Sequence, residues 1–126
     1  MSSPNFASIP RTETVRISAA NPNRDGTGTI TDLWVAPAAG SRIDKLSFMA
    51  INDTTAGMIR LFTKKGSVYR FYKEYQVTAQ TPSDSALAFN MQLTGLAIIL
   101  GNAVTLCVST SKGETFDITA EGGDFT

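Results

Sequence analysis

Histidine is absent from this chain of 126 residues, and cysteine occurs only once. Without histidine, the side chain that most often serves as an acid, a base or a metal ligand near neutral pH is missing. The single cysteine, Cys107, excludes an intramolecular disulfide, and no lysine or arginine lies beside it in the sequence to activate the thiol. We expect Cys107 to be a small buried hydrophobe. These shortages favour a binding or assembly role over catalysis.

Charge is scarce as well. Charged residues make up 17% of the chain, against about 25% in a typical soluble domain, and 11 basic residues balance 11 acidic ones. Such a surface has no long-range attraction for nucleic acid or for an anionic membrane. A net charge near zero also weakens self-repulsion, which suits a protein covered by partners or by its own copies. We therefore expect neither nucleic acid nor membrane as a partner.

Long apolar runs are lacking too. The longest, 96–100, is far shorter than the roughly 20 residues that a membrane-spanning helix needs. Residues 1–5 show no basic segment followed by an apolar one, so we do not expect a secretory signal. We expect the protein to be made in the cytoplasm. No segment carries an apolar helical stripe beyond two turns.

The chain consists instead of short strand-like runs separated by Gly, Pro, Asn and Asp. Alternation is clearest over 68–77, where Tyr69, Phe71, Tyr75 and Val77 are predicted to share the core face. A short helix beginning near 82–84 remains an alternative to the strand at 86–93. A two-residue hairpin turn is expected at 101–102. The predicted strands are 14–18, 28–35, 42–51, 56–63, 68–77, 86–93, 96–100, 104–109 and 115–120.

Strands that recur every 10–14 residues predict an all-β fold, an antiparallel two-sheet sandwich. A jelly-roll-like arrangement is the first choice and an immunoglobulin-like sandwich the second. No cysteine pair brackets Trp34, which excludes an antibody-type domain. We predict a single sandwich domain over 14–126, preceded by an extended N-terminal arm over 1–13. Phe6 and Ile9 are the apolar anchors of that arm and the candidate interface residues.

Candidate chemical motifs are weak. The segment 21–26 with Asp32 imitates the spacing of a calcium loop, but it lacks the final glutamate and the flanking helices. Carboxylates are scattered without a motif, and no serine has a histidine to activate it. On 68–77, only Tyr72 beside Arg70 is left for stacking on a base or sugar, so core packing is the favoured role of these aromatic residues. We assign no catalytic, cofactor-binding or metal-binding residue.

Four segments, 34–46, 54–62, 74–79 and 116–125, together resemble small β-rich virion proteins of tailed bacteriophages and prophages. The resemblance extends over about residues 28–125. It implies a structural, non-enzymatic virion protein, of which a capsid decoration (cement) protein on the outer head surface is the most plausible kind. Its implied partners are the major capsid protein and further copies of itself, with a trimer favoured, and binding would use the N-terminal arm.

Two alternatives stay open. One is a module of the phage tail or baseplate, or a receptor-binding module that grips a host glycan through exposed aromatic residues such as Tyr72 or Trp34. The other is a small enzyme on a cupin-like barrel, which the lack of histidine ligands makes a poor fit.

Overall fold

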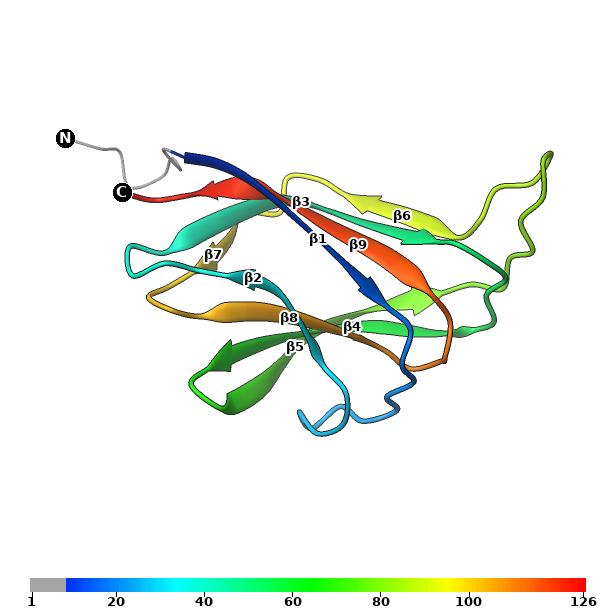
Figure 1. The fold of residues 1–126 in the computed structure, drawn as a ribbon, viewed down its shortest axis with the longest axis horizontal. Helices are drawn as coiled ribbons and strands as arrows, with labels where there is room; N and C mark the ends of the chain where they lie inside the picture. Colours follow the sequence, from blue (N-terminus) through cyan, green and yellow to red (C-terminus); the bar gives the residue numbers. More distant parts are fainter. Residues whose placement is uncertain (1–8) are drawn as a thin grey trace.

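The computed structural model describes residues 9–126, which form two antiparallel β-sheets and no helix (Figure 1). No helix in this range is thus available to cross a membrane. The all-β prediction is confirmed. The strands are β1 (Ile9–Ile17), β2 (Thr31–Val35), β3 (Ser41–Ala50), β4 (Gly57–Lys65), β5 (Val68–Val77), β6 (Asn90–Leu93), β7 (Ile98–Leu100), β8 (Thr105–Thr110) and β9 (Phe116–Asp124).

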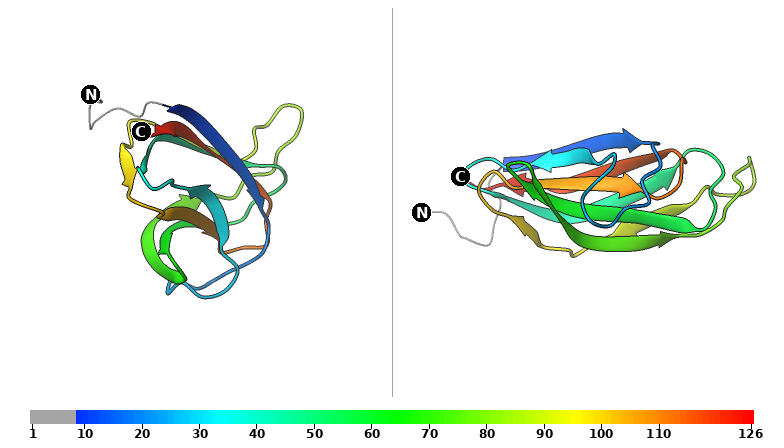
Figure 2. Two further views of the ribbon diagram at one scale, coloured as in Figure 1. Left: turned by 60° about the vertical axis from the view of Figure 1, so that its left-hand side comes forward. Right: turned by 90° about the horizontal axis from the view of Figure 1, so that it is seen from below.

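Strands from opposite ends of the chain pair with each other in a nested order. β1 pairs with β9, β2 with β8, β3 with both β6 and β7, and β4 with β5. The first sheet has the order β1-β9-β3-β6, with β7 also paired to β3, and the second has the order β2-β8-β4-β5. Figure 2 shows the two sheets as separate layers of a sandwich-like fold. Because the chain alternates between the layers, few neighbours within a sheet are neighbours in sequence.

The core lies between the two sheets and follows the alternation of each strand. In β3, Leu46, Phe48 and Ala50 are buried, as their spacing predicts, while Met49 between them is exposed. The second sheet contributes the largest core side chain, Trp34, which is fully buried. The other buried core residues of the second sheet include Leu33, Ile59, Leu61, Leu106 and Val108.

A β-bulge in β5 makes the predicted core face of this strand partly wrong. The register with β4 shifts at the bulge, so that Phe71 lies opposite Phe62 but Lys73 lies opposite Leu61. The extra residue, Tyr72, reverses the alternation. Tyr75, packed on the core, and the buried Val77 therefore face inward as predicted. Phe71 instead packs its ring 5.6 Å from that of Phe62, on the outer side of the sheet, and is 41% exposed.

The first strand begins earlier than predicted. Residues 9–13, assigned above to the extended arm, belong to β1 and pair in continuous register with 120–124 of β9. Pro10 is tolerated there because β1 is an edge strand, where a missing N–H need not interrupt a ladder. Ile9 is thus the first residue of a strand, whereas Phe6 lies outside the described residues. The arm as predicted does not extend over 9–13.

Two further local predictions are wrong. Of the strand expected at 86–93 only β6 forms, and the segment before it is a projecting loop with a turn between Ser83 and Ala86, not a helix (Figure 1). The turn at 101–102 does not make a hairpin, because β7 pairs with β3 in one sheet and β8 pairs with β2 and β4 in the other. This connection crosses between the layers, with Ala103 at a φ of 57°.

Candidate functional site

Arg11 of β1 ties the edge of the first sheet to the second. Its guanidinium carbon lies 4.4 Å from the centre of the Trp34 ring, within the range of a cation–π contact. Nη1 donates to the carbonyl oxygen of Val35 at 2.9 Å and to Asp124 Oδ1 at 3.0 Å. Nε donates to Glu13 at 2.8 Å. Side chains from β1, β2 and β9 are therefore fixed at one end of the molecule by a single guanidinium group.

The candidate interface residue Ile9 lies at this same end. Its cross-strand partner is Asp124, two residues before the last residue of the chain. The side chain is 51% exposed, and Val35 on the adjoining edge of the other sheet is 53% exposed. The N-terminal segment thus joins the domain beside the C-terminus, where exposed apolar side chains flank the Arg11 contacts. Phe6, the other candidate interface residue, lies outside the described residues.

The calcium-like segment is a loop that covers the outer face of the second sheet. Asn21 is 1% exposed, and its side-chain amide donates to the carbonyl oxygens of Thr27 and Thr29 while Oδ1 accepts from the backbone N–H of Asn23. Gly26, at a φ of 93°, approaches β5 so closely that a Cβ there would meet the side chain of Tyr69. The oxygen of Asn21 is therefore used to close the loop.

Asp32 takes no part in that loop. It accepts two hydrogen bonds from Lys64 Nζ, at 2.8 and 3.0 Å, and one from Cys107 Sγ at 3.3 Å. The Lys64 hydrogen bonds hold the pKa of Asp32 below its usual range, and the same contact raises the pKa of Lys64. Burial, followed by the bond to Asp32, raises the pKa of Cys107 to about 12. The predicted burial of Cys107 is confirmed, and its thiol is held in the unreactive protonated form.

Most carboxylates that might have formed catalytic pairs are bound to cations instead. Arg60, which is 4% exposed, donates to Glu74 at 3.3 Å, and Arg24 of the covering loop does the same. Arg16 forms a two-pronged pair with Asp117, whose pKa is lowered by it. Across residues 9–126, no group of three Cys, Asp or Glu side chains is placed to hold a metal ion.

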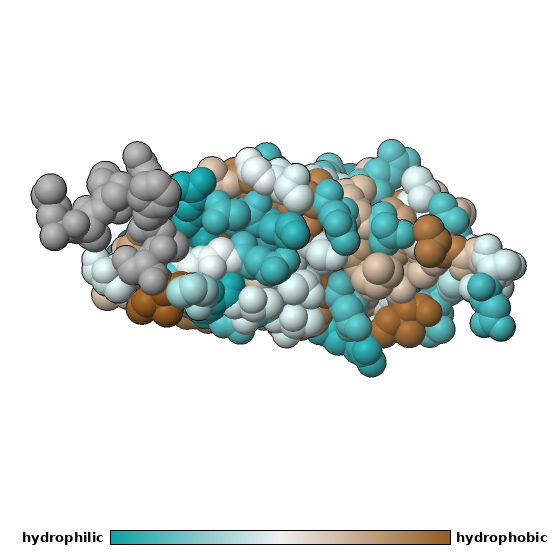
Figure 3. All heavy atoms as spheres, turned by 90° about the horizontal axis from the view of Figure 1, so that it is seen from above, coloured by the Kyte–Doolittle hydropathy of each residue, from teal (hydrophilic) through white to brown (hydrophobic). Residues whose placement is uncertain are grey.

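The outer face of the first sheet is polar, and among residues 9–126 no other strand or loop packs over its middle. One row across the four strands consists of Thr14, Thr119, Ser47 and Gln92, and the hydroxyl oxygens of the two threonines lie 3.3 Å apart. Figure 3 views the molecule from this side and shows hydrophilic and neutral side chains over the middle of the face. The face has no hollow and no concentration of one charge, so it offers a flat contact surface and not a site.

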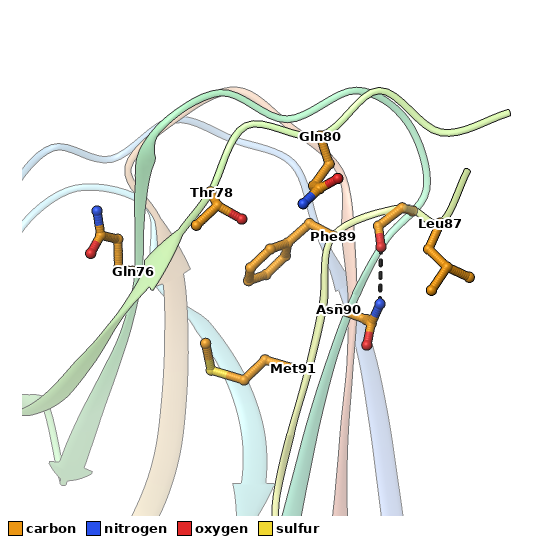
Figure 4. A pocket seen from close by; sticks show the side chains of 8 residues that line it. Gln76, Thr78, Gln80, Leu87, Phe89, Asn90 and Met91 are labelled. Atoms are coloured by element: carbon orange, nitrogen blue, oxygen red, sulfur yellow. Dashed lines mark hydrogen bonds between the residues drawn. The ribbon is translucent and has the colours of Figure 1, made fainter.

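A groove of about 450 Å³ opens where β5 ends beside the segment that leads into β6 (Figure 4). Its walls come from two parts of the chain that were predicted as strands but not as neighbours. One wall carries alternate polar residues, and Figure 4 shows Met91 extending from the other wall toward β5. The lining residues are Gln76, Thr78, Gln80, Leu87, Ala88, Phe89, Asn90 and Met91.

The aromatic residues proposed for glycan contact are not in this groove. Trp34 is 0% exposed and lies beneath Arg11, so Trp34 cannot contact a ligand at the surface. Tyr72 is 41% exposed, and Lys73 Nζ lies 5.7 Å from the centre of its ring. Reasoning from the sequence missed the groove residues. The polar residues at every second position from 76 to 80 were the available signal, but their partner segment was assigned to a strand.

A scan against protein-family models gives no match to this chain, and a search of curated proteins also finds no match.

Proposed function

We propose that the protein is a non-enzymatic structural component of a tailed-phage particle, a capsid decoration protein that binds the major capsid lattice and stabilises it. The observation that carries this proposal is the position of Ile9, where the N-terminal segment joins the domain. The sequence continues for eight residues before Ile9, and Ile9 begins an edge strand that Arg11 fixes to both sheets. A segment joined there can bind a neighbouring subunit without any rearrangement of the domain.

The fold within this proposal is a jelly roll. Nested pairing of β1 with β9, β2 with β8, β3 with β6 and β7, and β4 with β5 supports it, since a jelly roll folds one long antiparallel hairpin into two sheets. Jelly rolls occur in viral capsid proteins and in lectins. A fold alone does not give a function, so the anchor at Ile9 carries the proposal and the fold is only consistent with it.

Decoration requires little chemistry. Each contact can be weak because a lattice repeats it, and a second attachment point acts at a high effective concentration once the first is made. A homo-oligomer, a trimer in this proposal, multiplies attachment in the same way. The near-neutral surface favours such crowding of copies. No cofactor is needed, and the location is the capsid surface of the virion after synthesis in the host cytoplasm.

The test is binding to purified phage heads that lack the protein, measured by co-sedimentation, for the full chain and two truncations. Removal of residues 1–8 leaves β1 intact, so we expect a folded protein that no longer co-sediments. Removal of 1–13 also deletes the Arg11 contacts, and we expect it to lose stability as well. Full binding by the shorter truncation would refute attachment through residues 1–8.

Peptide mass spectrometry of intact particles provides the second measurement. Hundreds of copies per particle are expected of a decoration protein, because it follows the capsid lattice. A few copies to a few tens would place the protein in the tail, the baseplate or at a vertex. Absence from the particle would reject a virion role altogether.

A further inference from the structure

We propose that the groove between the end of β5 and residues 86–91 is a binding site for an uncharged carbohydrate. Its lining contains amide, hydroxyl and apolar side chains and no charged residue. Its volume of about 450 Å³ lies within the range of small-molecule sites, roughly 300–1,000 Å³. A neutral lining selects against anions and cations, because neither would recover the hydration free energy lost on entering the groove.

The polar wall holds unused hydrogen-bonding groups. Within the described part of the chain, the side chains of Gln76, Thr78 and Gln80 make no hydrogen bond, and all three are exposed. A glutamine amide can donate and accept at the same time, and a threonine hydroxyl does likewise. Adjacent hydroxyls of a sugar ring have this same dual character. Alternate positions on one extended segment therefore present a row of groups that matches a row of sugar hydroxyls.

The opposite wall supplies apolar surface. Leu87 is 80% exposed, the most exposed large hydrophobic residue between positions 9 and 126, and Met91 is half-buried. Phe89, 5% exposed, packs edge-on against Phe116 of the core and fixes the base of this wall. Asn90 donates to the carbonyl oxygen of Ala88 at 3.0 Å, which orders the segment. Sugars have apolar C–H faces as well as hydroxyls, so a groove with one polar and one apolar wall fits them.

An extended peptide fits less well because several main-chain groups along the groove are already engaged. Both backbone groups of Gln80 bond to Thr54, at 2.9 and 3.2 Å. The carbonyl oxygen of Thr78 accepts from the Thr54 hydroxyl at 2.8 Å, and that of Phe89 accepts from the backbone N–H of Ala50. Addition of a strand depends on free main-chain groups. The side-chain groups of Gln76, Thr78 and Gln80 are free instead, which favours a ligand that brings its own hydroxyls.

This inference does not depend on the decoration role, because no residue that lines the groove belongs to β1 or precedes it in the sequence. The test is an NMR titration of isotope-labelled protein with glucose, galactose, mannose and N-acetylglucosamine, followed by a printed array of neutral oligosaccharides. We expect at least one sugar to shift the side-chain amide signals of Gln76, Gln80 and Asn90. Replacement of both glutamines by alanine should weaken Kd about fivefold to tenfold, the equivalent of one hydrogen bond.

Gln92→Ala is the matched control, since Gln92 is equally an exposed glutamine, on β6, but faces away from the groove. It should leave Kd unchanged. The proposal is overturned if no neutral sugar perturbs the groove signals, or if the double glutamine variant binds as well as the control. Binding of a neutral extended peptide such as Gly-Ala-Ser-Ala-Gly to the same signals, without any sugar, would assign the groove to peptides. Particle binding is measured separately, so either proposal can fail alone.

Discussion

Replacement of Arg11 by alanine should destabilise the domain by about 2–3 kcal/mol. The ring contact with the fully buried Trp34 is worth about 0.5–2 kcal/mol, and the hydrogen bonds to Val35 and Asp124 add about 1–2 kcal/mol. The Arg11 side chain is 21% exposed, which reduces the electrostatic part. Asp124 still accepts a hydrogen bond from Ser41 at 2.6 Å. Glu13 loses its partner, but its side chain is 37% exposed and can be hydrated, so a larger loss is not expected.

The assay is urea unfolding followed by tryptophan fluorescence, because the chain has one tryptophan and Arg11 lies on its ring. Arg16→Ala is the matched control. Arg16 lies on the same strand and also pairs with an aspartate, but its side chain is 63% exposed, so its replacement should destabilise the domain far less than that of Arg11. Arg11→Met, which keeps the apolar stem over the ring, should recover part of the loss. Equal destabilisation by Arg11→Ala and Arg16→Ala would refute the assigned role of Arg11.

Three further outcomes are expected. Burial, and then a hydrogen bond to a carboxylate, raise the pKa of Cys107 to about 12, whereas an unfolded thiol titrates near about 8.5. The free energy of unfolding should therefore fall as pH rises above about 8.5, by about 2 kcal/mol at pH about 10. Urea unfolding of Cys107→Ala at several pH values should lack this fall. The same pH dependence in Cys107→Ala as in the parent would contradict the assigned pKa. Gly122→Ala should prevent folding because its Cβ would overlap the backbone of β3, whereas Gly101→Ala meets open space and should keep the parent Tm; cooperative unfolding of the first would disprove the close approach. Asn21→Ala should cost about 2–3 kcal/mol in thermal unfolding, since three backbone groups lose a buried partner.

Local sequence patterns were sufficient to predict much of the fold. Alternation in β3 identifies the core residues Leu46 and Phe48 because this strand is covered on one side only. The hairpin of β4 and β5 follows from its turn, where Gly66 adopts a φ of 63° as its position suggests. In these places the signal lies within the strand or the turn itself, and distant residues do not alter it.

Long-range contacts decide the rest. The sequence of β5 carries no sign of the bulge at Tyr72, which depends on how β4 and β5 twist together. The sequence predicts an arm at residues 9–13 because the strand that pairs with them lies at the far end of the chain. The stabilising contact of Arg11 depends on Trp34, which lies beneath its guanidinium group only in the folded state. The groove lies between two segments that are neighbours only in the folded state. The Arg11 contacts and the groove could not be inferred without knowledge of which strands pair.

The bulge in β5 also restricts how copies of this protein can associate. β5 is a free edge of the second sheet, and such edges readily pair with other strands unless something interrupts them. Tyr72 breaks the regular ladder, and Lys73 stands opposite the core residue Leu61, which places a charge on the inward side of the edge. Both features oppose edge-to-edge pairing of β5. The proposed homo-oligomer should therefore not form through the β5 edge, which leaves its side-chain surfaces and the other sheet edges, β1, β2 and β6, for contacts between copies.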